Sequence, residues 1–149
     1  MLKLIKSDFI LRTPTILDEN KVVNFRNEFL IKHCKFNGTC NLDQFNDYLE
    51  WLAYTISMAN GCKCDTDGKC AIKTYTYLAI NKTDDALLGM CEITHYCNSS
   101  SQHAHVIECL RPSERRKGYG DILTQLSIEE CRSFGIKKDK VTIERNSKS

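Results

Sequence analysis

A short basic segment with two glycines is the part of the sequence whose residue types are best suited to chemistry. It runs from Arg111 to Gly120 and reads R-P-S-E-R-R-K-G-Y-G. Its glycines let the backbone come close to a ligand. If a helix begins at Gly118, its first N–H groups have no partner within the helix and lie at the positive end of the helix dipole. These groups, with the basic side chains of Arg115, Arg116 and Lys117, suit a pyrophosphate.

Two better-known phosphate-binding motifs do not account for this segment. It lacks the G-x-x-x-x-G-K-[ST] pattern of the P-loop and the G-x-G-x-x-G pattern of dinucleotide-binding folds. Taken alone, the short motif is also compatible with a solvated basic turn that precedes a helix. The elements around the segment decide between these two interpretations.

The residue pattern around the segment predicts the elements that position it. Runs rich in β-branched and aromatic residues predict three strands, over 74–80, 86–96 and 103–110. Because short turns join these strands, we expect them to pair antiparallel as a meander. A helix over 118–134 and a last strand over 140–143 follow the basic segment. This order predicts a parallel strand pair joined by a crossover helix.

The N-terminal half of the chain predicts a short strand and two helices. The strand is expected over 2–5, and the first helix over 16–32, with Thr13–Pro14 as its N-cap and first-turn proline. The second helix is expected to begin at Asn41, which forms a capping-box pattern with Gln44. The apolar residues on one face of this second helix are expected to pack in the core: Leu42, Phe45, Tyr48, Leu49, Leu52, Ala53 and Ile56.

Together these elements predict one domain of the α/β (α+β) class over residues 1–149, with a mixed sheet. The composition agrees, since 42% apolar and 27% charged residues are typical of a globular protein. A net charge of +2 gives no reason to expect nucleic acid or a membrane as a partner. No apolar stretch approaches the ~20 residues of a membrane span, and no signal peptide is recognisable. A cytoplasmic location is therefore expected.

In this setting the basic segment resembles a known motif. The run R-P-S-E-R-R-K-G-Y-G, followed by a helix that ends at F-G-I and a strand K-V-T-I, resembles the acetyl-CoA motif of the GNAT superfamily of N-acetyltransferases. Upstream, L-D-Q-F-N-D-Y-L-E-W-L resembles the second helix of a bacterial GNAT subgroup, and L-L-G-M-C-E-I-T-H-Y its third strand. The resemblance implies a GNAT-like fold. It also implies transfer of an acetyl group from acetyl-CoA to a primary amine of a small molecule or a protein, by direct attack.

The resemblance further implies which residues bind acetyl-CoA. Three of them would lie along the pantetheine arm: Leu110, Arg111 and Pro112. The following residues would hold the pyrophosphate: Arg115, Arg116, Lys117, Gly118, Tyr119 and Gly120. Asn146 begins N-S-K-S, which resembles the N-x-x-S at the start of the fourth helix in this family. Asn146 is therefore included among the expected cofactor-binding residues.

Two residues on the strand before the segment are candidates for the general base that takes a proton from the amine. His105 occupies a place where GNAT enzymes often carry Glu or His, and a histidine titrates near neutral pH. Glu108 stands where the subgroup commonly has Tyr, and Ile107 where it has Gly. For either candidate, a position without a catalytic role is the alternative interpretation.

The resemblance ends at the C-terminus of the sequence. The fourth helix and the final strand of the family would follow Asn146, and they often supply a tyrosine that protonates the leaving thiolate. We therefore expect either a truncated product or a partner subunit that completes the site. A homodimer formed through the uncovered sheet edge is one such arrangement. The alternative function is a non-catalytic acyl-CoA-binding or interaction module.

The nine cysteines are expected to be reduced thiols, because no secretory signal accompanies them. The C-x-C-x5-C pattern of residues 62–70, with Cys34 or Cys40 as a fourth ligand, is a poor match to the paired knuckles of structural zinc sites. Residues 65–68 resemble the start of a calcium loop, but Thr76 stands where its glutamate is required. No metal is therefore expected.

Overall fold

The structure is a computed structural model that describes residues 5–35, 37–63, 71–97 and 102–146. Its helices are α1 (Glu19–Ile31), α2 (Tyr48–Asn60) and α3 (Tyr119–Ser133). Its strands are β1 (Phe9–Arg12), β2 (Cys62–Lys63), β3 (Ala71–Asn81), β4 (Leu87–Cys97), β5 (Gln102–Leu110) and β6 (Val141–Asn146). None of the described helices is long and apolar enough to cross a membrane.

The strands form one mixed sheet in the order β1-β3-β4-β5-β6, with β2 also beside β3. All pairs are antiparallel except β5 and β6, which run parallel. Helix α3 lies between β5 and β6 in the sequence and is the crossover helix of that pair. The predicted fold class, a meander followed by a parallel pair with a crossover helix, is therefore confirmed.

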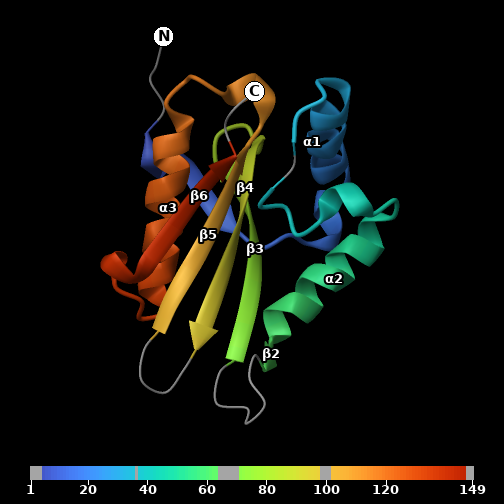
Figure 1. Cartoon of the computed structure of the whole chain (residues 1–149). Helices are drawn as coiled ribbons and strands as arrows, with labels where there is room; N and C mark the ends of the chain where they lie inside the picture. Colours follow the sequence, from blue (N-terminus) through green and yellow to red (C-terminus); the bar gives the residue numbers. More distant parts are fainter. Residues whose placement is uncertain (1–4, 36, 64–70, 98–101, 147–149) are drawn as a thin grey trace.

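Helices cover both faces of the sheet (Figure 1). On one face, α1 and α2 contribute Val22, Phe25 and Trp51 to a cluster that includes sheet residues such as Met90 and Cys109. On the other face, side chains of α3 pack against alternate residues of the same strands. Because side chains of a strand alternate between faces, the even-numbered residues of β5 face α3 and the odd-numbered ones face away from it.

One predicted element start is wrong and another is not tested. Of the strand predicted over 2–5, residues 2–4 lie outside the described part of the chain, and Ile5 precedes a 3-10 turn; the first strand of the described residues is β1. The second helix starts at Tyr48 rather than at Asn41, because the Asp47 side chain caps it by accepting the Leu49 N–H at 3.1 Å. Asn41 has a left-handed backbone and makes no capping bond.

The face that α2 buries also differs from the predicted one. Leu49 and Ile56, both predicted to be core residues, are 50% and 57% exposed, and Ala53 is exposed as well. The buried face contains Tyr48, Trp51 and Thr55. Trp51 donates its indole N–H to the Thr39 carbonyl at 2.9 Å, which fixes the rotation of the helix against the preceding loop.

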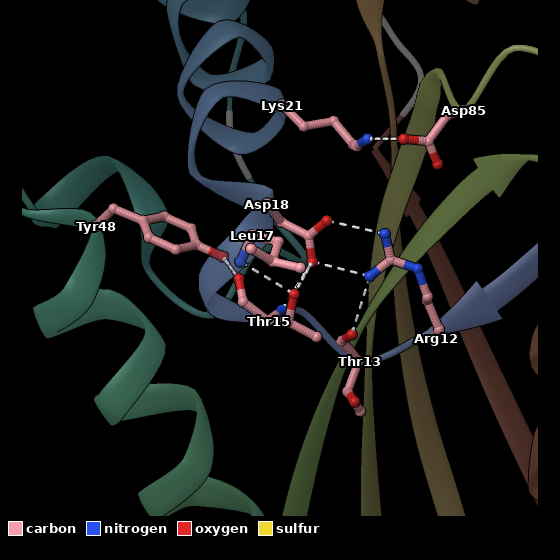
Figure 2. A network of polar contacts seen from close by, with 8 residues as sticks. All are labelled: Arg12, Thr13, Thr15, Leu17, Asp18, Lys21, Tyr48 and Asp85. Atoms are coloured by element: carbon pink, nitrogen blue, oxygen red, sulfur yellow. Dashed lines mark hydrogen bonds and ion pairs between the residues drawn. The ribbon is translucent and has the colours of Figure 1, made fainter.

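A partly buried ion pair joins β1 to the helical layer (Figure 2). Asp18, which is 3% exposed, accepts two hydrogen bonds of 2.8 Å from the Arg12 guanidinium and one of 2.7 Å from the Thr15 N–H. The Tyr48 hydroxyl of α2 donates to the Thr15 carbonyl in the same network. At the edge of this view, Lys21 of α1 pairs with Asp85 in the turn between β3 and β4. These contacts set the position of α1, which in turn contacts the loop before α3.

Candidate functional site

The N-terminus of α3 comes directly after the basic loop, as predicted. Gly118 precedes the helix with φ of +84°, a left-handed conformation in which other residues are strained. No side chain of the residues that the structure describes caps the helix at this position. A Cβ added at Gly118 would have no atom within 4 Å. The first turn of α3 therefore presents N–H groups that no side chain of the described chain covers at this point.

Helix α1 holds the first half of the loop. The Glu28 carboxylate accepts the Ser113 N–H at 2.7 Å and the Ser113 hydroxyl at 3.2 Å, and it lies 3.6 Å from the Arg111 Nε. The Arg111 guanidinium also lies 5.5 Å from the centre of the Phe25 ring. Ser113 and Arg111 of the loop are thus directed toward α1, and these contacts fix where the loop leaves the sheet.

Arg115, the second basic residue of the loop, also points toward α1. The Arg115 Nε donates to the Leu110 carbonyl at 3.2 Å, and its guanidinium lies 5.5 Å from the centre of the Phe29 ring. Lys117 forms an ion pair of 3.1 Å with Glu114. These side chains shape the loop in this structure, so the backbone N–H groups of α3 become the principal candidates for phosphate binding.

The remaining predicted cofactor residues are brought to the same end of the sheet. Leu110 is buried against α3, and Pro112 begins a 3-10 turn. The Tyr119 ring packs at 5.8 Å against the Phe9 ring. Arg116 has φ of +66°, which marks a tight turn in the loop. Gly120 lies in the first turn of α3, and the backbone of Asn146 pairs with Cys109 beside this loop.

Two hollows flank the loop. One, of about 160 Å³, lies between the loop and the turn joining β3 and β4, and its lining includes Arg111, Glu114 and Tyr119. The other, of about 540 Å³, lies beside the first turns of α3, and its lining includes Lys117 and Gly118. The loop is therefore accessible from both sides.

The two candidates for the general base lie on opposite faces of the sheet. Glu108 is fully buried under α3, where it accepts hydrogen bonds from Thr124 at 2.9 Å and from the Arg145 Nε at 3.3 Å. Burial raises the pKa of Glu108 above its ordinary value, against these two partners, which lower it. His105 lies on the other face, half-buried, with its Nε2 3.9 Å from Glu144 on β6. The structure does not bring the two candidates together.

A third candidate, the carboxylate of Glu92 on β4, lies on the same face as His105. One of its oxygens accepts the N–H of Cys40, from the loop between α1 and α2. Burial raises the pKa of Glu92, while the Cys40 N–H and the nearby His105 lower it. Sequence reasoning missed Glu92. Its signal is the lone carboxylate of β4, which stands between the buried residues Cys91 and Ile93 and so points to the opposite face of the sheet.

Glu92 lines a cavity of about 170 Å³ between that loop and the sheet. The other lining residues are Asn37, Gly38, Thr39, Asn41, Asp43 and Ile107. Gly38 permits the close approach, because a Cβ there would lie 2.5 Å from the Ile107 carbonyl oxygen. Among the described residues, the lining carries two carboxylates and no basic side chain, which suits a cationic ligand.

No metal centre emerges from the described residues, in which no group of three or more His, Cys, Asp or Glu side chains is placed to hold an ion. Cys40 is a buried free thiol, and burial raises its pKa to about 11. Of the residues considered for zinc, Cys64 and Cys70 lie outside the described ranges, as do residues 65–68 of the calcium-like pattern.

Comparison with protein families gives a match to the Acetyltransferase (GNAT) family over residues 37–149. No significant match was found among curated protein sequences. The matched region contains the basic loop, α3, the Glu92 cavity and both predicted base candidates.

Several solved structures have a similar fold. Glucosamine-6-phosphate N-acetyltransferase from Arabidopsis thaliana aligns with a TM-score of 0.54 at 13% identity, covering 91% of this chain and 81% of that one. A GNAT family acetyltransferase from Staphylococcus aureus gives 0.53 at 16% identity, with 95% and 88% covered. A predicted acetyltransferase from Clostridium acetobutylicum, solved with acetyl-CoA, gives 0.50 at 14% identity, with 91% and 79% covered. At these identities the similarity shows the fold alone.

Proposed function

This chain belongs to the acetyltransferase (GNAT) family, and we propose that it transfers an acetyl group from acetyl-CoA to a primary amine. The observation that supports this function most directly is the uncapped N-terminus of α3 behind the left-handed Gly118. Its N–H groups and the positive end of the helix dipole fit the pyrophosphate of acetyl-CoA. The structural relative from Clostridium acetobutylicum, which was solved with acetyl-CoA, supports the same cosubstrate.

The Glu92 cavity is the proposed site of the acceptor amine. Most amines are protonated at neutral pH, and an ammonium group suits a cavity lined by Glu92 and Asp43. Before it can react, the ammonium must lose a proton. A carboxylate whose pKa is raised by burial is a better general base near neutral pH than an ordinary one. We assign this role to Glu92, with His105 on the same face as the other candidate.

Acetyl-CoA would supply the acetyl group as an activated thioester. Glu92 would take the proton from the ammonium, so that the free amine attacks the thioester carbonyl carbon. A C–N bond forms and the C–S bond breaks, and the leaving thiolate takes up a proton. The burial of Glu108 under α3 supports a role other than proton transfer for that residue.

Binding of acetyl-CoA is the first prediction from this proposal. We expect acetyl-CoA and desulfo-CoA each to raise the melting temperature, by about 5–10 °C at a concentration near 100 Kd, because ligand binding adds about 2.7 kcal/mol to the stability of the folded state. Differential scanning fluorimetry measures this shift. Absence of a shift with both ligands would contradict the proposal. Binding without thiol release for any of a panel of amines would instead support a non-catalytic acyl-CoA-binding module.

A glycine substitution tests whether the N-terminus of α3 is the binding element. Gly118→Ala is expected to reduce stability by about 1–2 kcal/mol through left-handed strain alone, and to weaken acetyl-CoA binding at least about tenfold by shifting the first N–H groups of α3. Gly135→Ala is the matched control. Gly135 has φ of +85° and equally open surroundings, at the other end of the helix. Equal affinities of the two variants, measured by calorimetry, would argue against this site.

A further inference from the structure

Arg145, near the end of β6, lies across the first turn of α3. Its Nη2 donates to the Gly120 carbonyl at 3.2 Å and to the Thr124 hydroxyl at 2.6 Å, and it lies 3.6 Å from a carboxylate oxygen of Asp121. The side chain is 37% exposed, so the guanidinium reaches from the buried face of the sheet to the surface beside the helix N-terminus. The contact joins residues that are 25 positions apart in the sequence.

Gly120 is the residue that makes room for this guanidinium. A Cβ built at Gly120 would lie 3.0 Å from Nη1 and 3.2 Å from Cζ of Arg145. Such distances are shorter than ordinary van der Waals contacts, so alanine would push the guanidinium away from the helix. The second glycine of the basic loop thus places a positive charge against the turn whose N–H groups lack helical partners.

Glu108 fixes the orientation of Arg145 from the buried side. Its Oε1 accepts the Arg145 Nε at 3.3 Å and the Thr124 hydroxyl at 2.9 Å. The side chain of Glu108 is fully buried, and its Oε2 has no hydrogen-bond partner in the described part of the chain. Because Nε is held by Glu108 and Nη2 by the helix, the Nη1 group is the one left without a hydrogen bond to a described residue.

A buried carboxylate is a costly way to attach a strand to a helix, because removing charge from water costs several kcal/mol. Two residues earlier on the same face of β5, Val106 makes this attachment with apolar contacts. Unlike the apolar packing of Val106, the arrangement at Glu108 also holds a guanidinium in a fixed orientation at the N-terminus of α3.

We propose that Arg145 binds the pyrophosphate of acetyl-CoA at the N-terminus of α3, and that Glu108 is the positioning residue that orients Arg145 for this contact. This proposal rests on the proposed use of acetyl-CoA. It assigns the phosphate-binding charge to β6 rather than to Arg115, which is turned toward the Phe29 ring of α1. Arg145 acts together with the N–H groups of α3, since a guanidinium and helix N–H groups both donate to phosphate oxygens.

Calorimetric affinities of three ligands test the proposal: coenzyme A, 3′-dephospho-coenzyme A and pantetheine. Arg145→Met is expected to weaken binding of the first two by about 10–100-fold, the range for hydrogen bonds to charged groups, and to change pantetheine binding less than twofold. Pantetheine lacks the pyrophosphate, so an equal loss for all three ligands would mean a merely structural role. A loss confined to coenzyme A would assign Arg145 to the 3′-phosphate. Either result overturns the proposal.

Two further variants separate a direct effect on binding from an effect on folding. Arg132→Met removes one charge from the exposed last turn of α3, and it should leave the affinities for all three ligands unchanged. Arg145→Lys keeps the charge without the forked geometry, and an affinity for coenzyme A between wild type and Arg145→Met is expected. If Arg145→Met fails to fold, the lysine variant carries the test, and wild-type affinity in it would contradict the proposal.

Glu108→Gln tests the positioning role. It should weaken coenzyme A binding about 3–10-fold in the wild-type background and add no further loss in the Arg145→Met background. Additive losses would contradict the assignment of Glu108. If wild-type protein bound no coenzyme A at all, the proposed function would fail together with this inference. Binding that is unaffected by Arg145→Met would refute the inference alone.

Discussion

Replacing Glu92 with glutamine is expected to lower kcat by about 10²–10⁴-fold, the usual contribution of a general base. Glutamine keeps the size of the side chain and can still accept the Cys40 N–H, so the loop between α1 and α2 should stay in place. What is lost is the ability to take a proton from the ammonium. Thiol release with saturating acetyl-CoA and the best amine of a screen measures this change.

The pH dependence adds a second readout for Glu92. Burial raises its pKa, and the residue acts as a base only when it is deprotonated. The rate of the wild-type protein should therefore rise with pH through an apparent pKa above the ordinary carboxylate range. In Glu92→Gln this rising limb should disappear. A normal pH profile with kcat within threefold of wild type would exclude Glu92, and the same loss in a variant of His105 would transfer the role to that residue.

Asp43→Asn is the matched control for Glu92→Gln, since both carboxylates line the cavity and both changes remove one negative charge. Asp43 is exposed and, in this proposal, attracts the amine without moving a proton. Its loss should raise KM for the amine about tenfold or less, with kcat nearly unchanged. Equal falls in kcat for the two variants would mean that kcat depends on the negative charge of the cavity and not on proton transfer by Glu92.

Asp18→Asn should reduce the free energy of unfolding by about 2–4 kcal/mol. Asp18 is almost fully buried and accepts hydrogen bonds from both Arg12 and Thr15 (Figure 2). An amide cannot accept as many of these bonds, and it leaves the half-buried Arg12 charge unpaired. Urea unfolding at pH 7 measures the loss.

The effect of Asp18 should depend on pH in a defined direction. The side-chain hydrogen bonds from Arg12 are the main cause that lowers the pKa of Asp18 in the folded state. A lowered pKa stabilises the folded state above the pKa of the unfolded chain, about 4, and that stabilisation is lost as the pH falls through the folded-state value. The difference between wild type and Asp18→Asn should therefore shrink below about pH 4.

Asp85→Asn is the control for this prediction. Asp85 pairs with Lys21 in the same region, but its side chain is 71% exposed. Exposed ion pairs contribute about 0–1 kcal/mol, so its replacement should change stability by no more than that. Similar losses for Asp18→Asn and Asp85→Asn would show that burial of the Arg12–Asp18 pair does not decide its contribution.

The order of elements from β3 to β6 could be predicted from the sequence because the signals are local. Runs that contain β-branched and aromatic residues between short turns mark β3 to β5, and Gly118 and Gly135 mark the two ends of α3. The start of α2 could not be predicted in the same way. Asn41 and Asp47 are both good N-cap residues, and the choice between them depends on the packing of Trp51 under the loop that contains Thr39.

The sequence by itself determined the mixed α/β sheet, the loop that leads into α3 and the family resemblance, because each depends on residues adjacent in the chain. Only the tertiary structure decided which side chains meet at the candidate site. Glu92 meets a loop 52 residues away, and Arg145 meets Glu108 37 residues away. Strand periodicity places His105 and Glu108 on opposite faces, but which face α3 covers depends on the crossover and on core packing. For that reason the catalytic role proposed here moves to Glu92, and Glu108 becomes a positioning residue.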